Sequence, residues 1–480
     1  MSHGAGSLLG VLVATLAIGV VGHVLRRLAA RSGQGGFFVV IWLELVGLFF
    51  GYASIRDGSR WVFEACGLPF VPFAGFIVVF VLVLGVTAWF RKAGRLQFAA
   101  VTFCLAAAAI SLLMLAVAAL RFDSSPPEVA AANVKAISAS GGTRGPNVYY
   151  VILDSYPGSR GLQLASGIDN TAFVTRMAAR GFVDRSTERS NYLITQQTLG
   201  SIFALDYAQT EDARNRAKGR ALYPRLLDSD APPPLIARFK AAGYATWHSA
   251  SVWDDCPRKY FNCLGEAMFM RLDQMTQAYF APTPFGRPLL YVLGRRYDAL
   301  VSIVRDLPKL TSSTQPVFVF GHHMSPHPPF LFDGNCHRYS VRRESLDDWN
   351  PGPEVHQAFL EAITCVNLEV ERMVDAILRL DPNAFIVLQG DHGSAFALDW
   401  EKPISTWSAA SIDERASYLN LIRAPADCAR WLDRPLGQIN TARFVIACVE
   451  QRQPIYLPER TYLSTYFDGP ESDVVRQRGD

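Results

Sequence analysis

The tripeptide Asp391-His392-Gly393 offers what a divalent metal needs from one strand end: an oxygen, a nitrogen and a tight turn. It follows the short apolar run 385–388, which has the length and composition of a buried strand in a parallel sheet. In open α/β sheets the ligand sites lie at the carboxyl ends of the strands. The pattern therefore predicts metal ligation by Asp391 and His392, and an ordinary turn is the alternative.

Two further segments carry candidate site residues. Residues 148–153 form a second apolar run, which predicts a central strand with Asp154 at its carboxyl end. Capping of the following turn is the alternative for Asp154. Thr195 lies near the start of an apolar-periodic helix, where the field of the helix terminus would favour its alkoxide and an incoming anion. The ordinary alternative for a threonine in that place is to cap the helix.

Histidines cluster after another predicted strand. The strand at 316–320 leads into a proline-rich loop that contains His322, His323 and His327. Three imidazoles within six residues at a strand end make an uncommon loop.

The elements that would position these residues alternate between strands and helices. Helical patterns at 170–180, 232–243 and 354–380 separate the strands, and a further strand is predicted at 244–249. Alternation over about 330 residues predicts a doubly wound α/β domain at 146–480. Residues 122–145 are rich in Ser, Pro, Ala and Gly and predict a linker before this domain.

Residues 1–121 are predicted to form a four-span membrane anchor. Of the 480 residues, 50% are hydrophobic and 19% charged, and most of the apolar excess lies in this part. Four stretches have the length and low charge of membrane-spanning helices: Ser7–Gly22, Phe37–Ser54, Leu68–Phe90 and Gln97–Leu120. A cleaved signal peptide is the alternative for the first stretch, although that stretch lacks a basic start.

Basic residues predict the orientation of these spans. Three basic residues at 26–31 follow the first span, and three at 91–95 follow the third. The positive-inside rule places these loops in the cytoplasm, so the domain after residue 121 is expected to be extracytoplasmic. The net charge of +3 is too small to indicate a nucleic-acid partner.

Cysteine usage agrees with an extracytoplasmic domain. Six of the eight cysteines lie in it, an even number that suits an oxidising compartment. Connectivity does not follow from sequence, but pairing of neighbours is expected: Cys256–Cys263, Cys336–Cys365 and Cys428–Cys448. A cysteine-rich metal site is the alternative, which the absence of any Cys-x-x-Cys spacing in this domain disfavours.

Taken together, the motifs resemble the alkaline phosphatase/sulfatase superfamily. The resemblance is closest to its membrane-anchored branch, which includes the lipoteichoic acid synthases and the lipid A phosphoethanolamine transferases. It covers about residues 146–467 and rests on motifs in this order: 147–154, 190–195, Pro326-His327-Pro-Pro-Phe330, 390–393, 418–420 and 439–444.

The resemblance implies roles for the residues singled out above. One divalent metal ion, Mn, Mg or Zn, is expected with four ligands: Asp154, Thr195, Asp391 and His392. Thr195 is expected to attack phosphorus and form a phosphothreonine ester, with the metal lowering the pKa of its hydroxyl. His327 resembles the histidine that contacts the phosphate or protonates the leaving oxygen.

Departures from the family pattern narrow the chemistry. Formylglycine sulfatases carry Cys/Ser-x-Pro-x-Arg, whereas this chain has Thr195-Gln-Gln-Thr-Leu, so sulfate-ester hydrolysis through that cofactor is not expected. The additional ligands of dinuclear alkaline phosphatases cannot be placed, so one metal is expected. Thr198 and Ser201 are the alternative nucleophiles. Core or surface roles are expected for the remaining candidates, His248, His322, His323 and His337.

The implied function is transfer of a phospholipid head group, phosphoethanolamine or phosphoglycerol, to an envelope glycan or lipid. A multi-pass anchor in a bacterial inner membrane would keep a periplasmic site near its lipid donor. The first alternative is a phosphodiesterase or phosphatase that uses water as the acceptor. The second is a non-catalytic scaffold in an envelope polysaccharide assembly complex, against which the retention of all four ligands argues. The sequence identifies no protein partner in the envelope.

Overall fold

The computed structural model of the chain describes most of residues 145–478. The larger gaps in that range are 212–222, 250–255, 466–474 and most of 265–298 and 340–351. Before residue 145 the structure describes helix α2 (Gly35–Phe50) and short stretches between residues 20 and 82.

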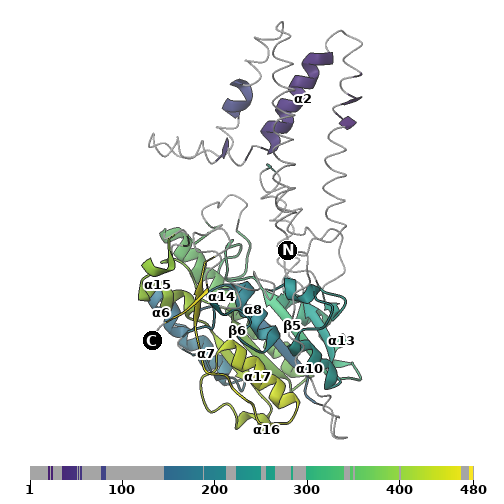
Figure 1. The fold of residues 1–480 in the computed structure, drawn as a ribbon, viewed down its shortest axis with the longest axis vertical. Coiled ribbons are helices and arrows are strands. Elements are labelled where there is room, and N and C mark those ends of the chain that lie inside the picture. The colour runs from purple at the N-terminus through teal and green to yellow at the C-terminus, as the bar shows by residue number, and fades with distance from the viewer. Residues whose placement is uncertain are drawn as a thin grey trace. The chain divides into compact units, whose positions relative to one another are not determined.

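The chain divides into two compact units. One comprises residues 3–125 and 271–293, and the other comprises residues 1–2, 126–270 and 294–480. In the first unit, α2 covers most of the predicted second span (Figure 1). The other predicted spans and the linker at 122–145 lie largely outside the described residues. In the part of the chain that the structure describes, no helix has both the length and the apolar character needed to cross a membrane.

The second unit is built on a seven-stranded sheet with the order β2-β7-β6-β1-β5-β3-β4. In chain order these strands are β1 (Val148–Leu153), β2 (Val183–Asp184), β3 (Ala245–Ser249), β4 (Asn262–Leu264), β5 (Val317–His323), β6 (Phe385–Gly390) and β7 (Asn420–Arg423). β6, β1, β5, β3 and β4 run parallel, as predicted, whereas β7 is antiparallel to both of its neighbours. The sheet is therefore mixed. A separate antiparallel pair is formed by β8 (Tyr462–Ser464) and β9 (Val475–Gln477).

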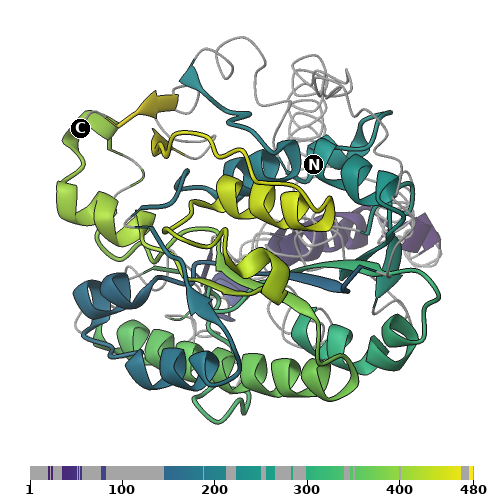
Figure 2. The ribbon, with the colours of Figure 1, turned by 90° about the horizontal axis from the view of Figure 1, so that it is seen from below.

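Helices cover both faces of the sheet (Figure 2), which confirms the doubly wound arrangement. One face packs against α6 (Ser159–Ser166), α7 (Thr171–Ala178), α13 (Ala299–Thr311) and α14 (Pro353–Leu380). The other face packs against α8 (Thr195–Ala204), α10 (Pro234–Ala241), α16 (Ala426–Ala429) and α17 (Gln438–Val449). Alternate residues of β1 enter the two cores because successive side chains of a strand point to opposite faces.

Strand β5 is longer than predicted, and this moves two histidines out of the loop. The prediction ended the strand at residue 320, but β5 continues to His323 because β1 pairs with it from Phe318 to His323. Ile152 pairs with His322 and Leu153 with His323. Both imidazoles are buried, and of the three clustered histidines only His327 lies in the loop.

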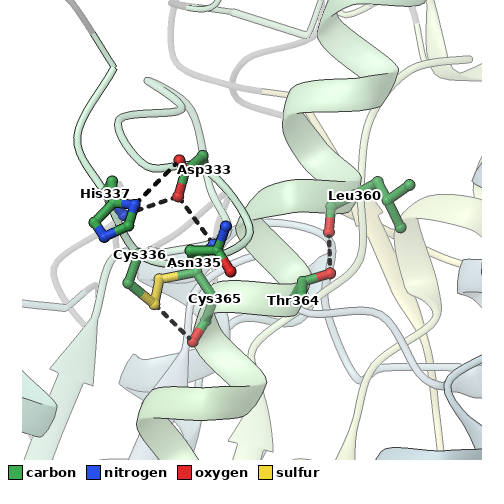
Figure 3. Close-up of a disulfide and its surroundings, with 7 residues drawn as sticks. All are labelled: Asp333, Asn335, Cys336, His337, Leu360, Thr364 and Cys365. Carbon is green, nitrogen blue, oxygen red and sulfur yellow. Dashed lines mark hydrogen bonds and ion pairs between the residues drawn. A yellow bond between two sulfur atoms is a disulfide. The ribbon is translucent and has the colours of Figure 1, made fainter.

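All three predicted disulfides are present, which confirms the pairing of neighbouring cysteines. Figure 3 shows the bond that ties the loop after His327 to α14 through Cys336 and Cys365. The Asp333 carboxylate supports this loop by accepting hydrogen bonds from the backbone nitrogens of Asn335 at 2.9 Å and His337 at 2.8 Å. The loop is thus anchored to a long helix that packs one face on the core.

Removing the Cys336–Cys365 bond should lower the free energy of unfolding of the second unit by about 3–4 kcal/mol, because it closes a loop of sequence separation 29. The measurement is urea unfolding of the full-length chain with alanine at both cysteines. The same change at Cys256–Cys263, with separation 7, should cost less, about 2–3 kcal/mol. Equal stability of the double-alanine chain and the wild type would contradict the prediction.

Candidate metal centre and nucleophile

The sheet register brings three strand ends to one place. β1 lies between β5 and β6, and Leu153 is opposite both His323 and Gly390. Asp154 follows directly and donates its backbone N–H to His323 O at 2.9 Å. Asp391 follows Gly390 in the same way on β6. The two predicted carboxylate ligands therefore meet because adjacent parallel strands end in register.

Asp391 is held by one oxygen and presents the other. Its Oδ1 accepts hydrogen bonds from the backbone nitrogens of Ser155 and His392, both at 2.9 Å. Its Oδ2 has no hydrogen-bond partner among the described residues and lies 3.0 Å from His392 Nε2. Burial, together with the charge of Asp154, raises the pKa of Asp391 to about 7.

The contacts of His392 identify which ring nitrogen carries its lone pair. Arg415 Nη2, which can only donate, lies 3.0 Å from Nε2, so Nε2 accepts. Nδ1 then carries the proton and donates to Gly393 O at 3.2 Å. Burial and the Arg415 charge hold the pKa of His392 well below its usual value. The neutral ring thus directs an unprotonated Nε2 at Asp391 Oδ2.

Asp154 is held at both carboxylate oxygens. Ser155 Oγ donates to Oδ1 at 3.1 Å, and His322 Nε2 lies 3.2 Å from Oδ2. Burial would raise the pKa of Asp154, but the charge of His327 and the hydrogen bond and charge of His322 outweigh it. The net effect lowers the pKa, so Asp154 is a buried anion.

This donor set fits a divalent cation. Asp391 Oδ2 and His392 Nε2 lie 3.0 Å apart, and Nε2 presents a lone pair. Ligand atoms of Asp154, Asp391 and His392 lie within 4.8 Å of one another, and all three residues are buried. Two carboxylates and one imidazole suit Mn, Mg or Zn. A cation at Nε2 would replace the hydrogen bond from Arg415.

Thr195 is the first residue of α8, and its hydroxyl faces the same nitrogen. The N-cap is Ile194, so capping, the alternative role for Thr195, is not what the structure shows. Thr195 Oγ1 lies 3.0 Å from His392 Nε2 and is buried. Thr198 Oγ1 instead donates to the Asp391 carbonyl at 3.2 Å. Of the three hydroxyls considered as nucleophiles, Thr195 is the one that contacts His392.

His327 lies in the loop after β5, half-buried, with its Nδ1 donating to Pro328 O at 2.6 Å. Its ring packs edge-on against Trp349, with centroids 5.9 Å apart. This leaves Nε2 as the nitrogen that can act on a substrate.

The family model described as Sulfatase matches residues 146–411, more than half of the chain. The chain belongs to the sulfatase family. It is accordingly an enzyme of the alkaline phosphatase/sulfatase superfamily, whose members are hydrolases and phosphotransferases. A comparison with curated protein sequences gives no match.

Several solved structures are similar to this sulfatase-family chain. The C-terminal periplasmic domain of EcEptC from Escherichia coli is 12% identical, with a TM-score of 0.44 and coverage of 71% of this chain and 94% of that domain. The lipoteichoic acid synthase LtaP from Listeria monocytogenes is 12% identical, with a TM-score of 0.40 and coverage of 67% and 78%. The phosphonate monoester hydrolase of Agrobacterium radiobacter is 11% identical, with a TM-score of 0.40 and coverage of 67% and 80%.

The other histidines of this sulfatase-family member have different surroundings. His248 on β3 is a core residue, stacked on Phe320 and within 3.3 Å of the Tyr223 hydroxyl. His337 is exposed beside Asp333. These two match their expected core and surface roles. His322 is also buried, and its Nε2 lies 3.2 Å from Asp154 Oδ2.

Two residues of α15 (Ala409–Ala416) that hold the turn after β6 were not predicted from the sequence. Arg415 is fully buried and donates to Leu193 O at 2.9 Å and to Gly393 O at 2.8 Å. It therefore links the segment before Thr195 to the turn that carries His392. Glu414 accepts hydrogen bonds from Ser394 Oγ and from the backbone nitrogens of residues 396 and 397. Buried charges of this kind give no signal in a single sequence.

Proposed function

We propose that this protein is a membrane-bound, metal-dependent transferase that moves a phospholipid head group to an envelope glycan or lipid through a phosphothreonine. The head group would be phosphoethanolamine or phosphoglycerol. The observation that carries the proposal is the buried Thr195 hydroxyl at a helix N-terminus, 3.0 Å from the Nε2 of His392, whose ring is grouped with two carboxylates. A hydroxyl in such a position is suited to nucleophilic catalysis.

The proposed metal ligands are Asp154, Thr195, Asp391 and His392. When bound, a divalent cation supplies a lowered hydroxyl pKa and compensation for the charge of a phosphoryl group. The chain itself contributes orientation. The backbone bonds to Asp391 Oδ1 and the Gly393 carbonyl at His392 Nδ1 fix the direction in which each ligand points.

The proposed transfer has two displacements at phosphorus. In the first, a bond forms between Thr195 Oγ1 and phosphorus, the bond to the diacylglycerol oxygen breaks, and His327 donates a proton to that oxygen. The threonine proton passes to solvent. In the second, an acceptor hydroxyl gives its proton to His327 and displaces Thr195, which recovers a proton. His327 thus serves as acid and then as base.

The proposed location is extracytoplasmic, with the lipid donor in the adjacent membrane. The three disulfides support this location, because such bonds persist in oxidising compartments. The predicted four-span anchor would hold the enzyme in a bacterial inner membrane. The acceptor, an envelope glycan or lipid, would then approach from the outside.

The test is trapping of the covalent ester. Full-length protein loaded with Mn²⁺ is mixed with vesicles of phosphatidylethanolamine and phosphatidylglycerol, quenched in acid and digested for peptide mass spectrometry. We expect a head-group adduct on Thr195 and release of diacylglycerol. Thr195→Ala should abolish both. Thr198→Ala, which removes a neighbouring buried hydroxyl on the same helix, should keep the adduct.

Each other outcome has a defined meaning. An adduct on Thr198 would overturn the assignment of the nucleophile. If the head group is released to water, and no added glycan or lipid acceptor competes with that release, the result would favour the hydrolase over the transferase. If metal-loaded protein forms no adduct and releases no diacylglycerol, the proposed use of phospholipid is overturned.

A further inference from the structure

A buried histidine on β5 contacts one of the proposed metal ligands. His322 Nε2 lies 3.2 Å from Asp154 Oδ2, and both side chains are almost completely buried. A carboxylate oxygen can only accept, so Nε2 carries the hydrogen of this bond. The contact joins residues 168 positions apart in the chain.

The sheet register explains why this histidine, and not the next one, reaches Asp154. Phe318 and Phe320 enter the core beneath α8, and His322 continues the same alternation on β5. Its pairing partner Ile152 enters that core as well, two residues before Asp154 on β1. Both side chains therefore lie on the face of the sheet that α8 covers. His323 lies on the opposite face.

Asp154 makes two further hydrogen bonds, one with His323 and one with Ser155. Its backbone N–H donates to His323 O, and its Oδ1 accepts from Ser155 Oγ at 3.1 Å. The bond from His322 occupies one direction at Oδ2 and so decides how the carboxylate plane is turned. A carboxylate that ligates a metal is ordinarily oriented by such an outer hydrogen bond.

We propose that His322 is a positioning residue that orients the Asp154 carboxylate toward the metal. The inference rests on the metal site of the proposed function, and it assigns His322 no contact with substrate. It goes beyond the core or surface role that the sequence suggested. Loss of an outer partner of this kind lowers metal affinity by about 10–100-fold.

The experiment measures metal affinity without turnover. Full-length protein is stripped of metal and titrated with Zn²⁺ and, separately, Mn²⁺ in competition with a fluorescent chelator. His322→Leu should bind each metal about 10–100-fold more weakly than the wild type. His322→Gln should stay within a few-fold of it, because the glutamine Nε2 can replace the imidazole donor. His322→Asn, whose amide is too short to reach, should behave like the leucine variant.

His248→Leu is the matched control, since His248 is also fully buried, lies on the neighbouring strand β3 and contacts the Tyr223 hydroxyl. It should leave metal affinity unchanged.

Equal affinities for His322→Gln and His322→Asn would overturn the proposal, even if the leucine variant fails to fold. A fall of equal size in His248→Leu would also overturn it, because the effect would then be loss of core packing. If the wild-type protein binds neither metal, the proposed function is overturned as well. If the wild type binds metal tightly and the His322 variants bind it equally well, this inference alone is overturned.

Discussion

Replacing Asp391 by asparagine should abolish metal binding and lower turnover by about 1,000-fold, while the metal-free protein becomes no less stable. The asparagine Oδ1 can still accept the two backbone hydrogen bonds from Ser155 and His392. What changes is the second atom. Asp391 Oδ2, which lies 3.0 Å from His392 Nε2, becomes an NH₂ group that can donate to that nitrogen but cannot bind a cation.

The sign of the stability change separates a ligand from a structural residue. In the metal-free wild type, an ionised Asp391 faces a second acceptor and is repelled by the buried charge of Asp154, and these costs raise its pKa. The amide removes both costs. A residue held only for packing or hydrogen bonding would instead lose stability on this change. We therefore expect a metal-free melting temperature at or above that of the wild type, and no increase on addition of Mn²⁺ or Zn²⁺.

The measurement is thermal unfolding of both proteins with and without metal, together with head-group transfer. Asp375→Asn is the matched control, because Asp375 forms a surface ion pair with Arg180 on the outer side of α14. It should keep both the metal-induced rise and the activity. If Asp391→Asn were stabilised by metal as strongly as the wild type, Asp391 would not be a ligand.

The proposed ligands were predictable because each lies at the end of its own regular element. Asp154 follows the apolar run that forms β1, and Asp391 follows the one that forms β6. Thr195 lies at the start of an apolar-periodic helix. Parallel strands that are buried on both faces read as continuous apolar runs, so their carboxyl ends can be located from local pattern alone. Register then brings these ends together.

The residues that orient the ligands were not predictable, because tertiary packing recruits them. Asp413, Glu414 and Arg415 read as a charged run, which ordinarily faces solvent. Only the packing of α15 onto the turn after β6 buries the second and third of them. His322 depends on the pairing of β1 with β5, and the sequence pattern ended β5 too early. Local periodicity carries no information about partners so far apart in the chain.

Gly393→Ala should have the second-largest effect on the site, because the turn after β6 lies directly on the backbone of α15. A Cβ at this position would overlap the Glu414 carbonyl oxygen and lie 2.6 Å from the Ser417 carbonyl oxygen. Neither atom can rotate away as a side chain would. The turn is also bound there, since Gly393 N donates to Arg415 O at 2.7 Å and Gly393 O accepts from Arg415 Nη1 at 2.8 Å.

Moving the turn off α15 would break these bonds and displace His392, which precedes Gly393. We expect destabilisation by about 1–3 kcal/mol, with weaker metal binding in the protein that remains folded. Gly352→Ala is the control, because a Cβ there meets nothing within 4 Å and its φ of −76° suits alanine. Unfolding in urea and Zn²⁺ titration of both variants test the prediction. If Gly393→Ala had the stability and the Zn²⁺ affinity of the wild type, the turn could shift without moving His392. The glycine at position 393 would then not be needed to hold His392 in place.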